Sequence, residues 1–368
     1  MKPHPAQWWY SESSDGEGTL VCELCPRQCH IAEGKAGYCF GRQNLNRQLV
    51  SAVYGRSMGF CIDPIEKKPL YHFLPGSPTL SFGTIGCNLG CRHCQNWQTS
   101  RCHSLNALVE QATPEMIAET AMQLACPSVS LTYNEPIVWA EFAVDTARAC
   151  RKLGIKTVAV TNGYIRTEPA KWFFEYIDAA NIDLKSFRVP FYRNIADGAL
   201  QSVLDTLIYL AKETGVWLEV TNLIIPGEND SPDELKDLCN WIATELGGHI
   251  PLHFSAFHPA YQLLHRPPTD AGTLLRAYAI ARSCGLRHVY LGNLASAGHQ
   301  TTYCGHCGVS LLERNAYGAM VTDNILLSSQ EDGNATCHKC GKRLAGFFAS
   351  TIGTWGNRRQ NVVVGRQR

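Results

Sequence analysis

Three cysteines in one short loop constrain this chain more than any other feature of its sequence. Cys87, Cys91 and Cys94 are spaced Cys-x3-Cys-x2-Cys and follow an apolar segment with the character of a strand. Gly86 and Gly90 let the backbone curl, so that the three sulfurs can converge on one point. Thiolates in such a loop suit soft metals and iron–sulfur clusters. A 4Fe–4S cube normally takes four cysteines, so a loop with three leaves one iron open to another ligand.

This loop resembles the cluster loop of the radical S-adenosylmethionine (SAM) superfamily. In that superfamily SAM chelates the open iron, and an electron from the cluster cleaves it to methionine and a 5′-deoxyadenosyl radical. The resemblance implies a 4Fe–4S cluster and SAM as cofactors, with an external one-electron reductant of the ferredoxin or flavodoxin type. The alternative is a zinc loop whose fourth cysteine lies elsewhere. A disulfide fits less well, because the number of closely spaced cysteines is odd.

Composition limits the other classes of function. The 368 residues predict one large domain with appendages. The formal net charge of +1, without a basic run, gives no support for nucleic-acid binding. We expect no membrane span, because no apolar stretch is long enough, and the N-terminus lacks a secretory h-region. Many of the 17 cysteines cluster at short spacings, which favours metal binding in a reducing cytoplasm over disulfides.

Four cysteines near the N-terminus form a second candidate ligand set: Cys22, Cys25, Cys29 and Cys39. Turns at two glycines between the third and fourth cysteine would bring the last sulfur back to the others. Four thiolates can close a tetrahedral zinc site or hold a second iron–sulfur cluster. The spacing in sequence does not decide between the two.

A connector at residues 63–69, Asp-Pro-Ile-Glu-Lys-Lys-Pro, narrows the resemblance. Together with Cys-x-Leu-Cys-Pro-Arg at 22–27 and Cys-Gln-Asn-Trp at 94–97, it is similar to the radical SAM member of the AmmeMemoRadiSam system. That family is related to the glycyl-radical-enzyme activases, such as the pyruvate formate-lyase activating enzyme. The resemblance covers nearly the whole chain. It implies Memo-type and Ammecr-type proteins as partners, whereas the substrate follows from no residue.

Strand-like and helical segments alternate from residue 79 onward. Helix signals include Thr113 before Pro114, a capping box of Ser231 and Glu234, and Thr269 as the cap of a later helix. Repeated βα units predict an α/β fold with a parallel sheet, closed or open as a (β/α) barrel, and with its chemistry at the carboxyl ends of the strands. The expected strands are 79–85, 128–133, 157–161, 180–184, 217–225, 252–257 and 288–291.

The tail carries two Cys-x2-Cys knuckles, each followed by glycine: Cys304 with Cys307, and Cys337 with Cys340. This pattern predicts a rubredoxin-like lobe with one tetrahedral metal, with structural zinc favoured and a redox iron as the alternative. The predicted domains are therefore 1–78, an N-terminal four-cysteine lobe with its connector, 79–297, the barrel, and 298–368, the C-terminal lobe. Among the remaining cysteines, Cys61 and Cys102 flank the cluster region and are candidates for a catalytic thiol, whereas Cys150 and Cys239 lie in helical patterns and are expected in the core.

Polar residues at the strand ends are the candidate SAM ligands. Radical SAM enzymes commonly end the second strand in Gly-Gly-Glu, and here Glu135 stands at that place after Tyr133 and Asn134. Alternation puts Asp183 and Lys185 on one face, where Lys185 could pair with the SAM carboxylate or only with Asp183. The resemblance to the activases adds His253 of the sixth strand, with His258, just past the end of that strand, as the alternative. The candidates are Asn134, Glu135, Asn162, Asp183, Lys185, Asn222 and His253.

These features predict a radical SAM enzyme that abstracts a hydrogen atom from a substrate. One alternative is an activase that installs a glycyl radical on a partner enzyme. Another is a non-enzymatic metal-ribbon protein that mediates contacts through its four-cysteine lobes, although a barrel between the lobes argues against that as the whole function.

Overall fold

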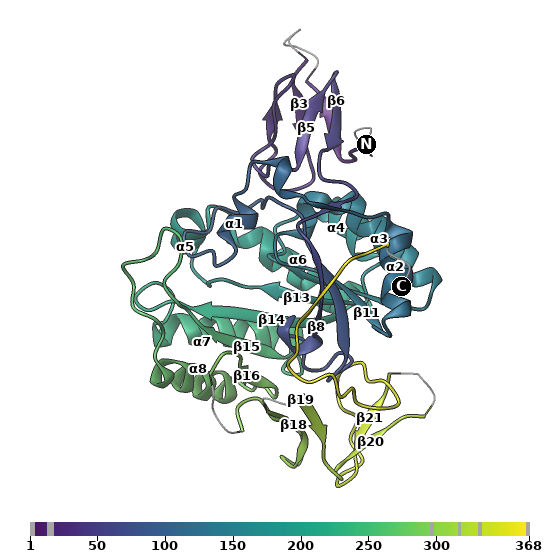
Figure 1. Cartoon of the computed structure of the whole chain (residues 1–368). Coiled ribbons are helices and arrows are strands. Elements are labelled where there is room, and N and C mark those ends of the chain that lie inside the picture. Colours follow the sequence, from purple (N-terminus) through teal and green to yellow (C-terminus); the bar gives the residue numbers. More distant parts are fainter. Residues whose placement is uncertain (1–3, 13–17, 295–297, 316–317, 330–332, 366–368) are drawn as a thin grey trace.

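A twisted nine-stranded sheet forms the centre of the molecule (Figure 1). The computed structural model describes residues 4–12, 18–294, 298–315, 318–329 and 333–365. Seven strands are parallel and lie side by side in sequence order, which confirms an α/β fold with a parallel sheet. They are β9 (Pro78–Phe82), β11 (Ser128–Leu131), β12 (Lys156–Thr161), β13 (Ala179–Asp183), β14 (Trp217–Ile224), β15 (Leu252–Ala256) and β16 (Val289–Leu291).

The sheet is open in the described part of the chain, because β16 pairs with β15 alone. At the other edge β9 pairs with antiparallel β8 (Phe60–Pro64), and β8 pairs with antiparallel β22 (Gln360–Val362). The central sheet thus takes one strand from the predicted N-terminal unit and one from the predicted C-terminal unit. All five residues of β8 are buried, so this strand, which runs into the connector 63–69, belongs to the core.

Helices connect the parallel strands, and their sequence signals explain most of their ends. Thr113 caps α2, its hydroxyl accepting from the Met116 N–H at 3.2 Å. The longer helices are α2 (Pro114–Gln123), α3 (Ala140–Lys152), α4 (Thr167–Phe174), α6 (Leu200–Glu213), α7 (Pro232–Trp241) and α8 (Ala271–Ser283). Shorter turns are η1 (Ile65–Lys67), α1 (Trp97–Ser100), η2 (Leu105–Ala107), η3 (Pro136–Trp139), α5 (Val189–Phe191), η4 (Tyr192–Ala196) and η5 (Ile242–Gly247).

Two of the predicted caps differ in the structure. Ser231 accepts from the Glu234 N–H, but the Glu234 carboxylate accepts from the Phe187 N–H at 3.0 Å instead of closing the box. Asp270, not Thr269, caps α8. The Thr269 hydroxyl instead donates to the Ile224 carbonyl at 2.6 Å, because Thr269 lies against the end of β14.

The two four-cysteine lobes lie at opposite ends of the molecule (Figure 1). The N-terminal lobe contains two small antiparallel sheets near α1, from β1 (His4–Pro5), β5 (Arg42–Leu45) and β6 (Gln48–Ser51), and from β2 (Trp9–Ser11), β3 (Leu20–Cys22) and β4 (His30–Ile31). The short strands β7 (Arg56–Ser57) and β10 (Glu110–Gln111) pair with each other.

The C-terminal lobe contains β17 (Thr302–Tyr303), β18 (Ser310–Asn315), β19 (Gly318–Val321), β20 (Ile325–Leu327) and β21 (Ala335–Cys337). Among the described residues, no helix has both the length and the apolar character to cross a membrane.

Candidate functional site

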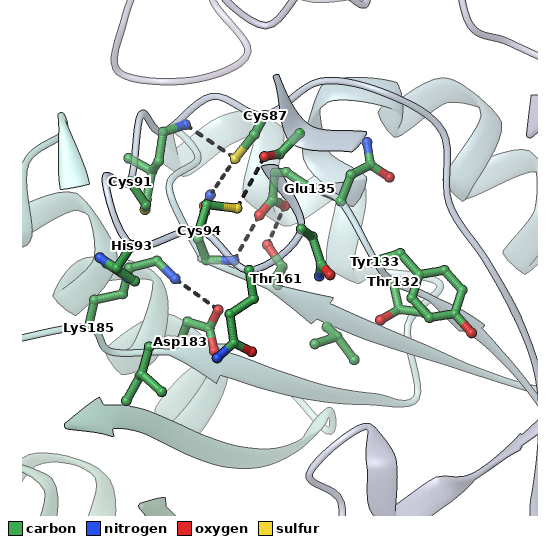
Figure 2. A pocket seen from close by; sticks show the side chains of 18 of the residues that line it. Cys87, Cys91, His93, Cys94, Thr132, Tyr133, Glu135, Thr161, Asp183 and Lys185 are labelled. Carbon is green, nitrogen blue, oxygen red and sulfur yellow. Dashed lines mark hydrogen bonds and ion pairs between the residues drawn. The ribbon is translucent and has the colours of Figure 1, made fainter. Parts of the chain in front are cut away.

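A cavity of about 290 Å³ lies at the carboxyl ends of the parallel strands. Its wall comes from the three-cysteine loop after β9 and from residues at the ends of β11, β12, β13, β14 and β15. Figure 2 shows the cysteines on one side, with Glu135, Thr161, Asp183 and Lys185 around the same space. The position agrees with the rule that α/β sheets carry their ligands at the carboxyl ends of the strands.

Cys87, Cys91 and Cys94 all line this cavity, so the donor set fits an iron–sulfur cluster held by three thiolates. Gly86 has φ +93°, a backbone conformation that glycine adopts without strain. Gly90 serves a different purpose from the expected turn, because a Cβ there would lie 2.4 Å from the Tyr38 hydroxyl. The two glycines therefore also make room for the N-terminal lobe.

Glu135 is buried beside the cluster loop and accepts several hydrogen bonds. Its carboxylate accepts from the Asn162 N–H at 2.8 Å, from the Ile137 N–H at 3.1 Å and from the Thr161 hydroxyl. Burial raises the pKa of Glu135 to about 7, although these hydrogen bonds oppose the rise. A buried carboxylate with such a pKa can accept a hydrogen bond from an amine ligand and is sensitive to pH near neutrality.

Asp183 and Lys185 form an ion pair inside the cavity, with 3.0 Å between Nζ and Oδ2. Burial lowers the pKa of Lys185, but the nearby Asp183 carboxylate outweighs it, so that the pKa stands well above its usual value. Lys185 is therefore cationic. His93 also lines the cavity and was not predicted; burial, together with Lys185, lowers its pKa to about 3, which keeps the imidazole neutral.

Asn134 and Asn162 line the cavity, but their amides are bonded to the cluster loop. Asn134 accepts from the Thr84 N–H at 2.8 Å and donates to the Gly86 carbonyl at 2.9 Å. Asn162 donates to Asn88 Oδ1 at 2.9 Å, with Cys87 Sγ 3.6 Å from the same nitrogen. Both side chains thus fix the loop that carries the sulfurs.

The structure does not bring Asn222 and His253 to the cavity wall. Thr221 and Leu223 line it, so alternation turns Asn222 to the other face of β14, where it donates to the Leu184 carbonyl at 2.8 Å. His253 is buried in the sheet outside the cavity wall, and its Nε2 lies 2.6 Å from a carboxylate oxygen of Glu219. These two expectations need correction, because strand sequence shows neither the inward face nor the depth of a residue.

A buried polar network beside the cavity was not predicted from sequence. Tyr133 lines the cavity with φ +71°, an uncommon conformation for a non-glycine residue, and its hydroxyl lies 2.7 Å from Cys61 Sγ. The same hydroxyl donates to Asp63, which is paired with Lys68 at 2.6 Å. Asp63 and Lys68 come from the connector 63–69, so this connector shapes the cavity wall through Tyr133.

The C-terminal cysteines form a compact ligand set. The sulfurs of Cys304 and Cys340 are 3.6 Å apart, those of Cys307 and Cys337 are 3.7 Å apart, and all four lie within 4.8 Å of one another. Sulfurs on one tetrahedral zinc are separated by about 4 Å, given bonds of about 2.3 Å. A four-cysteine metal site is therefore present in this lobe.

The N-terminal cysteines line a second cavity, next to the cluster loop. Cys22, Cys25, Cys29 and Cys39 all line it, together with Asn88 of the loop itself.

Comparison with known proteins gives a family model, related sequences and related structures. The model of the Radical SAM superfamily matches residues 82–242. An uncharacterized protein of Methanocaldococcus jannaschii is 42% identical over 91% of this chain and 97% of its own length. The pyruvate formate-lyase 1-activating enzyme of Escherichia coli is 31% identical over 44% of this chain and 68% of its own length. Among solved structures, a domain of the pyruvate-formate lyase-activating enzyme from Bacteroides vulgatus is 20% identical, with TM-score 0.40, over 45% of this chain and 98% of that one.

Proposed function

Because this chain belongs to the radical SAM superfamily and is an enzyme of that class, we propose that it cleaves SAM reductively and uses the resulting radical to abstract a hydrogen atom from a substrate. The observation that carries the proposal is the meeting of three thiols with Glu135 and the Asp183–Lys185 pair in one cavity. The residues present fit a cluster with one open iron, which supplies the electron and the binding point for SAM.

Eight residues that line the cavity have a role in this proposal. Cys87, Cys91 and Cys94 hold the cluster, while Asn134 and Asn162 hold their loop in place. Glu135 accepts a hydrogen bond from the amino group of SAM, because its buried carboxylate faces the cavity beside the loop. Lys185 supplies a cation for the SAM carboxylate, with Asp183 keeping its ammonium in position.

The direct test is anaerobic incubation of protein, SAM and dithionite, with 5′-deoxyadenosine measured by chromatography. Glu135→Ala should keep the cluster iron and weaken SAM binding by about 1.5–3 kcal/mol, the contribution of a hydrogen bond to a charged group. This corresponds to about tenfold to a hundredfold in affinity, measured by calorimetry. Glu228→Ala, which removes a carboxylate paired with Arg266 outside the cavity, is the matched control. Equal SAM affinity in both variants would remove Glu135 from the site.

The connector 63–69 and the 22–27 motif support a finer proposal, that the chain is the radical SAM member of the AmmeMemoRadiSam system. Memo-type and Ammecr-type proteins are then its proposed partners. Co-purification of the three tagged proteins, with cluster-loop residues left intact, tests this assignment.

A second candidate function is activation of a glycyl-radical enzyme, favoured by the 31% identity to the Escherichia coli activating enzyme. The two functions differ in where the hydrogen atom comes from. An activase takes it from a partner glycine, so that incubation with a glycyl-radical enzyme should give a protein-based radical by electron paramagnetic resonance. An unchanged spectrum with SAM cleavage intact favours the first proposal.

A further inference from the structure

The N-terminal cavity has an arrangement of sulfurs unlike that of the C-terminal lobe. Strands β3 and β4 place Cys22 and Cys29 together, with the Cys22 N–H donating to the Cys29 carbonyl at 3.0 Å. Cys25 and Cys39 complete the ring around the same cavity. The four C-terminal sulfurs all lie within 4.8 Å of one another. In the described part of the chain, no three of the N-terminal sulfurs lie that close together.

This wider spacing separates the two kinds of metal centre. Four sulfurs on one zinc ion are about 4 Å apart. Four sulfurs on a 4Fe–4S cube each bind a different iron and are about 6 Å apart. The barrel cysteines Cys87, Cys91 and Cys94 also fall outside the compact group, although they line one cavity. The distances between the N-terminal sulfurs therefore resemble those in the cluster loop, and they exceed those in the C-terminal site.

Arg42 supplies an independent indication that this cavity takes a ligand with acceptor atoms. Its side chain lines the cavity, and the residue is 1% exposed. One end pairs with Glu141 at 3.1 Å, but the Nε–H has no hydrogen-bond acceptor among the residues that the structure describes. A buried donor of this kind is costly unless a partner occupies the space beside it. Cluster sulfides accept such hydrogen bonds, and a cation balances their negative charge.

The cavity lies directly against the loop that carries the barrel cysteines. Asn88 lines it and, through the amide of Asn162, is connected to Cys87. The backbone contact is also close, because a Cβ at Gly86 would lie 2.0 Å from the Cys39 carbonyl oxygen. Arg27, on the wall of the cavity, donates to the Asn88 carbonyl at 2.5 Å. The hydrogen bond between Asn162 and Asn88 thus connects the wall of one cavity with the wall of the other.

We propose that Cys22, Cys25, Cys29 and Cys39 hold a second 4Fe–4S cluster that passes electrons to the barrel cluster. The proposal rests on the proposed function, since it supplies that site with its electron. An external reductant of the flavodoxin or ferredoxin type loses one electron and the N-terminal cluster gains it. The same electron then moves to the barrel cluster, which returns the N-terminal cluster to its oxidised state. No bond forms or breaks, and no proton moves. Cys25 and Cys29 are partly exposed, which gives the reductant an approach.

Metal content decides the first half of the proposal. Anaerobically prepared wild-type protein should contain about eight iron and eight sulfide per chain, with about one zinc. The variant Cys87→Ala/Cys91→Ala/Cys94→Ala leaves the N-terminal lobe untouched and should keep about four iron, with the Mössbauer signature of a 4Fe–4S cluster. If this variant holds no iron and about two zinc ions, the N-terminal cluster is ruled out. This result does not depend on SAM cleavage, so the proposed function is judged separately.

The electron source decides the second half. Cys25→Ser/Cys29→Ser should keep SAM cleavage with dithionite, a small reductant that reaches the barrel cluster itself. Cleavage driven by reduced flavodoxin should fall about tenfold or more, because the relay is lost. An unchanged flavodoxin-driven rate overturns the relay. Loss of both activities, with the barrel iron gone, also overturns it, because the lobe would then hold the loop together without carrying electrons.

Discussion

The N-terminal and C-terminal lobes each contribute four cysteines, yet they differ in sulfur spacing, in neighbours and in attachment to the sheet. The four C-terminal sulfurs lie within 4.8 Å of one another, whereas no three of the N-terminal sulfurs, which line the second cavity, lie that close together. The N-terminal lobe packs against the cluster loop at Gly86, and the C-terminal lobe docks through Arg314, which donates to the Tyr71 carbonyl at 2.6 Å. Equal numbers of cysteines therefore stand in two different structural settings, and the compact set is the one whose geometry fits a single metal ion.

The largest difference should be between a barrel cysteine and a tail cysteine. Cys91→Ala should abolish dithionite-driven SAM cleavage, because it removes one of the three thiolates of the loop. Cys340→Ala should leave cleavage near the wild-type rate, since its sulfur lies in the C-terminal metal site. Production of 5′-deoxyadenosine is the measurement. If the Cys91 variant still forms it, the central cluster assignment is wrong.

The second difference concerns folding of the C-terminal lobe. Cys337→Ser/Cys340→Ser should lose one metal ion and become sensitive to protease beyond about residue 300, because metal ligation supplies much of the ordering free energy of a small lobe. Metal analysis and limited proteolysis measure both effects, with SAM cleavage as the control. A variant that keeps its full metal content would contradict the assignment. A folded tail with lost SAM cleavage would favour the redox-iron alternative.

A third, smaller difference compares two glycines with positive φ. Gly86 has φ +93° and no room for a Cβ, whereas Gly341 has φ +67° and open space around it. Gly341→Ala should lower the free energy of unfolding by about 1 kcal/mol, because a residue with a side chain must adopt a left-handed conformation there. Gly86→Ala should cost about 3 kcal/mol or more, because the Cys39 backbone must also move. Thermal unfolding and barrel iron content measure the effect, and equal shifts in Tm would show that the lobe contact is unimportant.

The smallest effect should come from Glu135, which lies between the lobes without belonging to either. Its pKa is raised to about 7, so the free enzyme takes up a proton as pH falls from 8 to 6. The neutral acid accepts a weaker hydrogen bond, and SAM affinity should fall by about fivefold, or about 1 kcal/mol. Glu135→Gln cannot titrate, so its SAM affinity, measured by calorimetry at each pH, should lack this pH-dependent fall. If the affinity of the wild type and of the variant changes with pH in the same way, Glu135 does not take up the proton.

Much of the fold could be predicted because the sequence encodes it locally. Alternating strand and helix patterns predicted all seven parallel strands to within a few residues. Glu135, expected from the resemblance to a motif at the end of the second strand, lines the cavity, and its role there stays a prediction. The Tyr133 network could not be predicted, because it joins Cys61 and Asp63 to a residue about seventy positions away. Sequence also gives the spacing of cysteines along the chain, but the distance between their sulfurs depends on how separate segments pack.

Pairing of β22 with β8 has a consequence for how the protein is synthesised. Strand β8 ends at Pro64, whereas its outer partner spans Gln360–Val362, so about three hundred residues must leave the ribosome between the two. Until then β8 presents an unpaired backbone edge, the feature through which nascent chains pair with one another. Contacts so distant in sequence also form slowly. Incomplete chains should therefore be more prone to associate than chains in which β22 has been synthesised.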